Sequence, residues 1–345
     1  MKGVTATYDV HGTHITVEAA GTELGGMVDT VLKSCATDQT DEKTFLLCLR
    51  YGDPAPPADS ASLRVFWSGI LPGGLPMVFR CADGQREIEL PGRARARLDW
   101  PRRLAEIVVA RGAEGCVLDG CVLPLVCTIL GHAGQHVIHA ASLVGSSGRG
   151  RRALLLSGVS GAGKTTTALA LAGAGLQLMA DDASFVRLAG DPEHGRGVAL
   201  SASKGDRSKA EVWGLPLPCK VHRNTLAMLP WLERLPRWPA RSDGEFLIEV
   251  ARVQPPAAPP APPALILFLD PRNPEEHRVQ PMEKTAALAR LLRENVRAYE
   301  QTAESVAGEA FAAMAALVRA SATYRVSLCP SLDGLLDRIA PLLEA

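Results

Sequence analysis

Residues 158–165 combine the residue types that a protein needs to hold a chain of phosphates. They run Gly-Val-Ser-Gly-Ala-Gly-Lys-Thr and match G-x-x-x-x-G-K-[ST] at every fixed position. Glycines let backbone N–H groups turn inward without a Cβ clash, and a following helix adds the positive end of its dipole. Lys164 is expected to reach the β- and γ-phosphates, and the Thr165 hydroxyl to ligate Mg²⁺. The predicted nucleotide-binding residues are Gly158, Ser160, Gly161, Ala162, Gly163, Lys164, Thr165 and Thr166.

The surroundings of this loop favour a functional role. An apolar strand, ALLLS, precedes the loop, and a good helix-forming segment, TTTALALAGAG, follows it. The chain has 29 arginines and only 8 lysines, so a lysine at this one position of the motif is less expected by chance. We therefore predict a strand–loop–helix unit that binds a nucleotide.

Asp181 and Asp182 follow the next apolar run, LQLMA, 17 residues after the loop lysine (181 − 164). A carboxylate at the carboxyl end of a strand is where a nucleotide enzyme needs one for its metal. Two adjacent carboxylates allow two tasks, because one can hold the metal while the other takes the proton of an attacking hydroxyl. Asp270, at the end of ALILFLD, is a rival, but Pro271 follows it directly and the Asp pair has the better spacing.

His139 and a group of cations are further candidates. His139 interrupts the apolar run HVIHAASLV, where it is either a core residue or a partner that orients a nearby Asp. Lys204, Arg207 and Lys209 follow the acids, and they either place charge on the transferred group or belong to a solvated loop. The residues alone leave both choices open.

Hydrophobic periodicity and turn signals indicate the elements that must position these residues. We expect a helix over 119–134 and a buried strand over 136–144 before the loop strand. Apolar faces at helical spacing are predicted for Leu288, Leu291 and Leu292, and for Phe311, Met314 and Leu317. The proline-rich stretch 255–263 is predicted to be an exposed loop inside one domain. Strand 264–270 and a closing helix from 331 onward complete the list.

The N-terminal segment, 1–115, carries no motif that we can attach to chemistry. Strands are expected over 44–52, 63–70 and 76–80. The arginine-rich run 93–103 is either a solvated face or a basic groove. We therefore divide the chain into an α/β segment, 1–115, which is a candidate for acceptor recognition, and a catalytic domain, 116–345.

Length and composition bound the classes of protein that remain. The chain has 345 residues, enough for about two domains, and 37 basic against 37 acidic side chains. A net charge of +0 argues against a protein that gains affinity by neutralising nucleic-acid phosphates. No signal-like apolar start, no membrane-length apolar run and no CxxC pair among eight cysteines are present. We expect a cytoplasmic protein with neither nucleic acid nor membrane as partner.

The combination of IHAASLV, GVSGAGKT and LMADDA resembles the HPr kinase/phosphorylase family and its kinase-like relatives. The resemblance covers about residues 119–345. It implies an α/β fold: a P-loop core like that of phosphoenolpyruvate carboxykinase, with a mixed sheet and flanking helices. The smaller α/β N-terminal segment would precede this core. Since relatives include hexamers, a homo-oligomer is left open.

The same resemblance implies the roles of the site residues and the cofactors. Asp181 would be the general base with His139 beside it, and Asp182 would ligate Mg²⁺ together with Thr165. The reaction would transfer the γ-phosphoryl group of ATP to a serine hydroxyl. The arginine- and glycine-rich sequence that accompanies phosphate removal in the family is absent, since AEVWGLPLPCKVHR takes its place. The N-terminal segment does not match the family, which favours an acceptor other than HPr, as in relatives that phosphorylate ribosomal peptides.

We therefore predict a kinase that uses ATP and Mg²⁺, with Asp181, His139 and Lys164 as its catalytic residues. The predicted acceptor is a serine of a protein or peptide. Two alternatives stay open: a nucleotide-dependent regulatory or binding module with little catalysis, and a small-molecule kinase. The sequence fixes neither the acceptor nor the choice of ATP over GTP.

Overall fold

A computed structural model of the chain describes residues 3–41, 43–71, 74–82, 84–148, 150–188, 210–240, 244–249, 259–270, 276–295, 304–329 and 331–344. In this part the protein is mixed α/β, with seven α-helices and four sheets, two mixed and two antiparallel. It divides into two compact units: the described residues up to Gly134, with 304–307, form the first, and the other described residues form the second. Among the described residues, no helix is long and apolar enough to cross a membrane.

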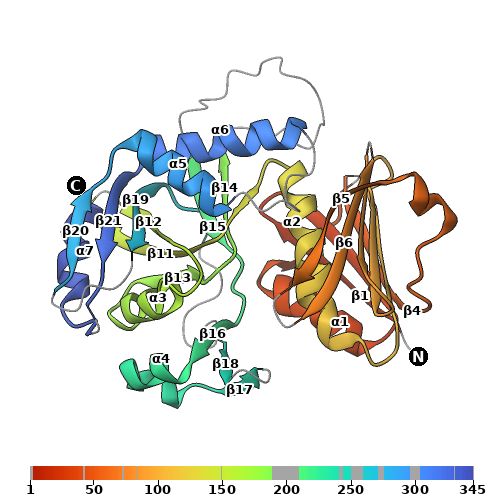
Figure 1. Ribbon diagram of the computed structural model, residues 1–345, viewed down its shortest axis with the longest axis horizontal. Helices are drawn as coiled ribbons and strands as arrows, with labels where there is room; N and C mark the ends of the chain where they lie inside the picture. Colours follow the sequence, from red (N-terminus) through yellow and green to blue (C-terminus); the bar gives the residue numbers. More distant parts are fainter. Residues whose placement is uncertain are drawn as a thin grey trace. The chain divides into compact units, whose positions relative to one another are not determined.

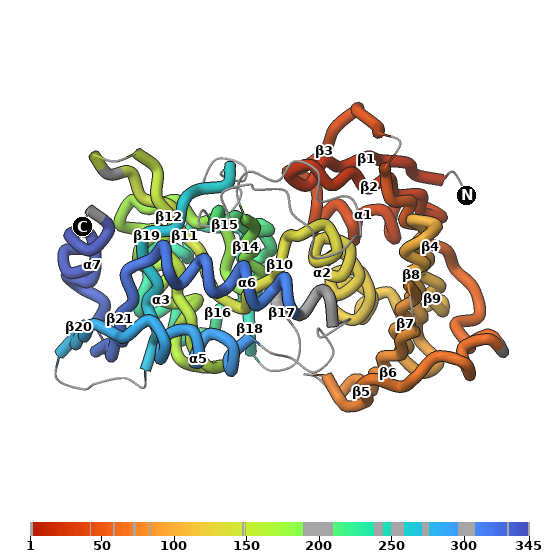
Figure 2. The backbone as a smooth tube through the Cα atoms, turned by 90° about the horizontal axis from the view of Figure 1, so that it is seen from above, coloured from red at the N-terminus to blue at the C-terminus, as the bar shows by residue number. Residues whose placement is uncertain are grey.

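The first unit is built on a nine-stranded sheet with the order β3-β1-β2-β4-β9-β8-β7-β6-β5. Its helix α1 (Thr22–Leu32) packs against β1, β2 and β4, and α2 (Leu123–His132) follows a π-helical turn that packs against β7 and β8 (Figure 2). The strands are β1 (Val4–Val10), β2 (Thr13–Ala19), β3 (Ala36–Thr37), β4 (Phe45–Tyr51), β5 (Arg64–Leu71), β6 (Leu75–Ala82), β7 (Gln85–Leu90), β8 (Ala94–Asp99) and β9 (Leu104–Val109).

The sequence predicts only part of this sheet. The three expected strands are confirmed as β4, β5 and β6, and the helix expected over 119–134 is confirmed as α2. The arginine-rich run is only partly a solvated face, because Arg93 and Arg102 are exposed but Ala94–Asp99 form β8. Arg95 is buried and donates to the Ala55 carbonyl at 3.0 Å, and Arg97 pairs with Asp59 at 2.7 Å. These arginines hold the preceding loop against the sheet.

The second unit is built on a six-stranded mixed sheet with the order β13-β11-β12-β19-β21-β20. Because β12, β19 and β21 are parallel, their carboxyl ends meet at one edge. The strands are β11 (Ala140–Ser147), β12 (Gly150–Ser157), β13 (Gln177–Ala180), β19 (Pro263–Asp270), β20 (Arg278–Pro281) and β21 (Ala322–Ser327).

Helices cover both faces of this sheet (Figure 1). On one face, α3 (Lys164–Gly173) and α7 (Leu335–Glu344) pack on the apolar side chains of the central strands. On the other, α5 (Lys284–Asn295) and α6 (Glu304–Ala320) do the same. Of the predicted helical faces, Leu291 and Leu317 are fully buried, but Phe311 is half exposed, so its assignment to the core is wrong.

Two antiparallel three-stranded sheets complete the second unit. One has the order β10-β14-β15, and the other, β16-β18-β17, carries the short helix α4 (Arg223–Met228). Their strands are β10 (His136–Ile138), β14 (Ser184–Leu188), β15 (Ala210–Gly214), β16 (Cys219–His222), β17 (Arg237–Ala240) and β18 (Glu245–Ile248). The expected cations Lys204, Arg207 and Lys209, and residues 255–258 of the proline-rich stretch, lie outside the described residues.

Candidate functional site

The sequence 158–165 forms a loop between the end of β12 and the start of α3. Gly161 and Gly163 have φ of 81° and 95°, a left-handed conformation that residues with a Cβ rarely adopt. The Ala162 amide donates to the Val159 carbonyl at 3.1 Å, which closes the turn. Lys164 is 8% exposed, and its Nζ donates to the Gly158 carbonyl at 2.7 Å. The lysine therefore points back into the loop, where a phosphate group would be held.

His139 and the Asp pair lie at two crossings of the chain between sheets. The run 136–144, expected to be one strand, is split at His139 into β10 and β11. Asp181 and Asp182 join β13 to β14. Since β10 pairs with β14 and β11 with β13, the two crossings must lie side by side. The sheet pairing thus brings together polar residues that are about 40 positions apart in the chain (181 − 139 = 42).

The hydrogen bonds link these residues in a different order from the one that the resemblance implies. Thr165 Oγ1 donates to Asp181 Oδ2 at 3.1 Å, so the loop threonine contacts the first acid. His139 Nδ1 lies 2.8 Å from Asp182 Oδ1, so the histidine contacts the second. The Asp182 side chain is 60% exposed, whereas Asp181 is 6% exposed. One acid therefore faces the loop from inside, and the other faces solvent with a histidine partner.

Burial dominates the electrostatics of Asp181. The pKa of this carboxyl is raised from 3.8 to about 7. Loss of solvent is the largest cause, and the adjacent charge of Asp182 is the second. The Thr165 hydroxyl, the Lys164 charge and the Lys220 backbone act in the opposite direction on this pKa. Oδ1 of Asp181 is buried and makes no hydrogen bond to any residue that the structure describes. Such a group is expected to gain from a cation.

Replacing Asp181 with asparagine is expected to stabilise the free protein at pH 8. Because the pKa is raised on folding, the native state binds the carboxyl proton more tightly than the unfolded state does. The stability that this group contributes is therefore fully present below about pH 3.8 and is lost as the pH rises through 7. Asparagine carries no charge and escapes this loss, so the free energy of unfolding should rise by roughly 4 kcal/mol at pH 8 and by less than half of that at pH 5. Denaturant unfolding of both proteins in a chelator, at pH 5 and pH 8, measures the effect. An equal difference at both pH values would contradict it.

Two other sequence-based candidates have contacts of their own. Thr166 is buried, and its hydroxyl is 2.9 Å from that of Thr225, so its side chain joins α3 to α4. Asp270 forms ion pairs with Arg290 at 2.6 Å and Arg325 at 2.7 Å. Burial alone would raise the pKa of Asp270, but the hydrogen bonds and charges of these two arginines lower it below its usual value. Asp270 is thus held by cations within the protein.

Sequence reasoning missed the residues of β15 and β16 that lie over the acids. A Cβ on Gly214 would lie 2.5 Å from Ala180 Cβ and 2.9 Å from the Met179 carbonyl carbon. The end of β15 therefore touches the backbone directly before Asp181, which only a glycine allows. Cys219 is buried, and desolvation together with the charges of the two acids raises the pKa of its thiol. No local motif marks either residue.

Replacing Gly214 with alanine is expected to destabilise the protein by about 1–3 kcal/mol and to displace Asp181, because backbone atoms cannot yield to the new methyl group. Denaturant unfolding measures the first effect, and ATP affinity the second. Gly26→Ala is the matched control: it lies in α1 with nothing within 4 Å of the new Cβ, so it should be neutral or stabilising. Unchanged stability of the Gly214 variant would exclude the close approach.

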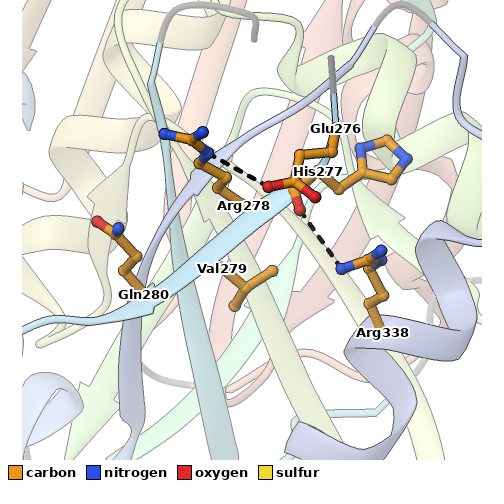
Figure 3. Close-up of a pocket in the computed structure, with 6 residues that line it drawn as sticks. All are labelled: Glu276, His277, Arg278, Val279, Gln280 and Arg338. Atoms are coloured by element: carbon orange, nitrogen blue, oxygen red, sulfur yellow. Dashed lines mark hydrogen bonds and ion pairs between the residues drawn. The ribbon is translucent and has the colours of Figure 1, made fainter.

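A separate open pocket of about 370 Å³ lies beside β20 and α7 (Figure 3). An ion pair of 3.5 Å joins Arg278 to Glu276, and Arg338 donates to the His277 carbonyl at 3.4 Å. The pocket is lined by Glu276, His277, Arg278, Val279, Gln280 and Arg338. Two strands, β19 and β21, separate β20 from the loop strand, and none of the sequence-based site residues lines this pocket.

Comparison with known proteins adds no family assignment. No protein-family model matches the chain, and no curated protein matches it. The residues that bear on function are therefore the loop 158–165, the acid pair and His139.

Proposed function

We propose that the protein is a Mg²⁺- and ATP-dependent kinase that transfers the γ-phosphoryl group to a hydroxyl, preferably a serine of a protein or peptide. The observation that carries this proposal is the hydrogen bond between Thr165 and Asp181, which links the phosphate loop to the acid pair. The six-stranded sheet with helices on both faces supports a core like that of phosphoenolpyruvate carboxykinase. The serine acceptor rests on the sequence resemblance.

The residues present fit a magnesium ion that is held mainly by the nucleotide. In the described part of the chain, no group of three or more His, Cys, Asp or Glu side chains could hold a metal by itself. Magnesium in phosphoryl-transfer sites needs only one or two protein oxygens, with substrate phosphates and water as the other ligands. Thr165 and Asp181 would hold it, since the Asp181 Oδ1 is buried without a hydrogen-bond partner among the described residues. The ion would offset charge on the phosphates.

The hydrogen bonds favour Asp182 as the proton acceptor, the reverse of the role that the resemblance implies. Asp182 is the more exposed acid, so an acceptor hydroxyl can approach it, and His139 at 2.8 Å can orient its carboxylate. In the proposed step the hydroxyl oxygen bonds to the γ-phosphorus while the bond from this phosphorus to the β,γ-bridging oxygen breaks. The hydroxyl proton passes to Asp182, and ADP leaves. Lys164 offsets the charge on the phosphates.

The test uses the full-length protein with γ-labelled ATP and Mg²⁺. The acceptors are three fractions of a cell extract: proteins, peptides and small molecules. Label on serine in the first or second fraction, absent with Lys164→Ala, supports the proposal. Label confined to small molecules indicates a small-molecule kinase. Tight ATP binding without transfer to any fraction indicates a regulatory module, and no nucleotide binding at all would exclude every form of the proposal.

A further inference from the structure

The last two turns of α5 contact both halves of the proposed site, although no sequence motif marks them. Three residues make these contacts, and we call them the α5 bracket: Arg290, Glu294 and Asn295. They are far from the site in sequence, since Ser157 and Glu294 are 137 positions apart and His139 and Asn295 are 156. Glu294 contacts Ser157, directly before the loop 158–165, and Asn295 contacts the backbone of His139.

Glu294 fixes the strand end from which the loop starts. Ser157, fully buried and next to Gly158, donates from its hydroxyl to Glu294 Oε2 at 2.8 Å. The other carboxylate oxygen accepts from Arg290 Nε at 2.7 Å. Arg290 also donates to the Leu269 carbonyl at 2.7 Å, so the same network holds the end of the neighbouring strand β19. Gly158, whose carbonyl accepts the Lys164 hydrogen bond, follows Ser157 directly. The bond between Ser157 and Glu294 therefore fixes the position at which the loop begins.

Asn295 fixes the crossing that carries the histidine. Its Oδ1 accepts the backbone N–H of His139 at 2.5 Å, and its Nδ2 donates to the Leu291 carbonyl at 2.8 Å. These two bonds satisfy both ends of the amide, and they do so inside the protein, because the asparagine is 6% exposed. His139 lies between the end of β10 and the start of β11 and belongs to neither strand. The amide thus sets the position from which the imidazole reaches Asp182.

We propose that the α5 bracket is a positioning element of the kinase site, with Glu294 acting on the phosphate loop and Asn295 acting on His139 and Asp182. This inference rests on the proposed function. The apolar residues Ala287 and Leu291 already anchor α5 to the sheet. Apolar packing alone allows small shifts of the helix, whereas buried hydrogen bonds fix its position, because each donor and acceptor is satisfied in one arrangement only. Small misplacements of reacting groups cost large factors in rate.

The test separates the two arms by their kinetic effects. Asn295→Ala should lower kcat by on the order of 10- to 100-fold and leave the KM and Kd for ATP unchanged, because only the acceptor side is displaced. Asn295→Asp, which keeps an acceptor for the His139 amide, should recover part of the loss. Ser157→Ala and Glu294→Ala should each raise the Kd for ATP about tenfold. The double variant should raise it by less than the product of the two single effects, because both changes remove the same bond.

Arg293→Ala, an exposed change in the same turn, is the control for effects on helix stability. Thermal unfolding of every variant shows whether activity is measured on folded protein. NMR of histidine-labelled protein gives a readout apart from activity: the His139 signals should shift in Asn295→Ala and stay in Arg293→Ala. An active wild type whose bracket variants match Arg293→Ala overturns the inference. A wild type that neither binds ATP nor transfers phosphate overturns the proposed function, and the bracket role with it.

Discussion

Replacing Lys164 with alanine is expected to reduce phosphoryl transfer to near background and to weaken ATP binding severely. The lysine is 8% exposed and already lies inside the loop, with its Nζ on the Gly158 carbonyl. The lysine ammonium would attract bound phosphates directly, and low solvent access strengthens this attraction. Loss of one such preorganised donor lowers kcat/KM by on the order of a hundredfold to a thousandfold. Titration with a fluorescent ATP analogue and the labelled transfer assay measure the two effects.

The control for this prediction is Lys33→Ala, which removes an exposed lysine from the first unit. It should bind and react as the wild type does. Thermal unfolding of Lys164→Ala shows whether its activity is measured on folded protein. A Lys164 variant with unchanged affinity for ATP would show that the loop does not bind phosphates.

Asp182→Asn is expected to lower kcat by about 10²- to 10⁴-fold, the usual contribution of a positioned proton acceptor. The ATP affinity and the Mg²⁺ concentration that gives half-maximal rate should stay unchanged, because Asp182 bonds His139 and Thr165 bonds Asp181. Asp181→Asn should instead raise the Mg²⁺ requirement. Asp337→Asn, an exposed acid in the first turn of α7, is the matched control.

The opposite result would reinstate the roles that the sequence resemblance implies. In that case Asp182→Asn would raise the Mg²⁺ requirement, and Asp181→Asn would lower kcat at saturating Mg²⁺. Loss of transfer without a change in Mg²⁺ requirement in both variants would mean that neither acid is a metal ligand.

The phosphate loop and the acid pair were predictable because their signals are local. A glycine-rich turn between an apolar strand and a helix, and two acids directly after a strand, need no knowledge of the rest of the fold. The partner of each acid was not predictable, because it depends on how the chain crosses between two sheets. His139 did carry one signal: a polar residue inside an apolar run marked the break between β10 and β11.

The α5 bracket and the strands β7 and β8 were hidden for a related reason. The pair Arg290 and Glu294 has the i, i+4 spacing of an ordinary surface pair, yet both side chains are largely buried. In β7 and β8, buried Arg86, Glu87 and Arg95 interrupt the apolar alternation by which strands are recognised. Charged residues that are satisfied inside the protein look like solvent-exposed residues in the sequence.

The distance in sequence between α5 and the residues that it holds has a consequence for the order of folding. The loop, its strand and the acid pair lie within 139–182 and can form early from nearby contacts. Glu294 and Asn295 make their contacts only after loops of 137 and 156 residues have closed. Closing these loops costs more chain entropy than forming local contacts does. A chain still emerging from the ribosome would thus hold a formed phosphate loop before α5 docks. Under mild denaturant, detachment of α5 should abolish phosphoryl transfer while the sheet remains folded.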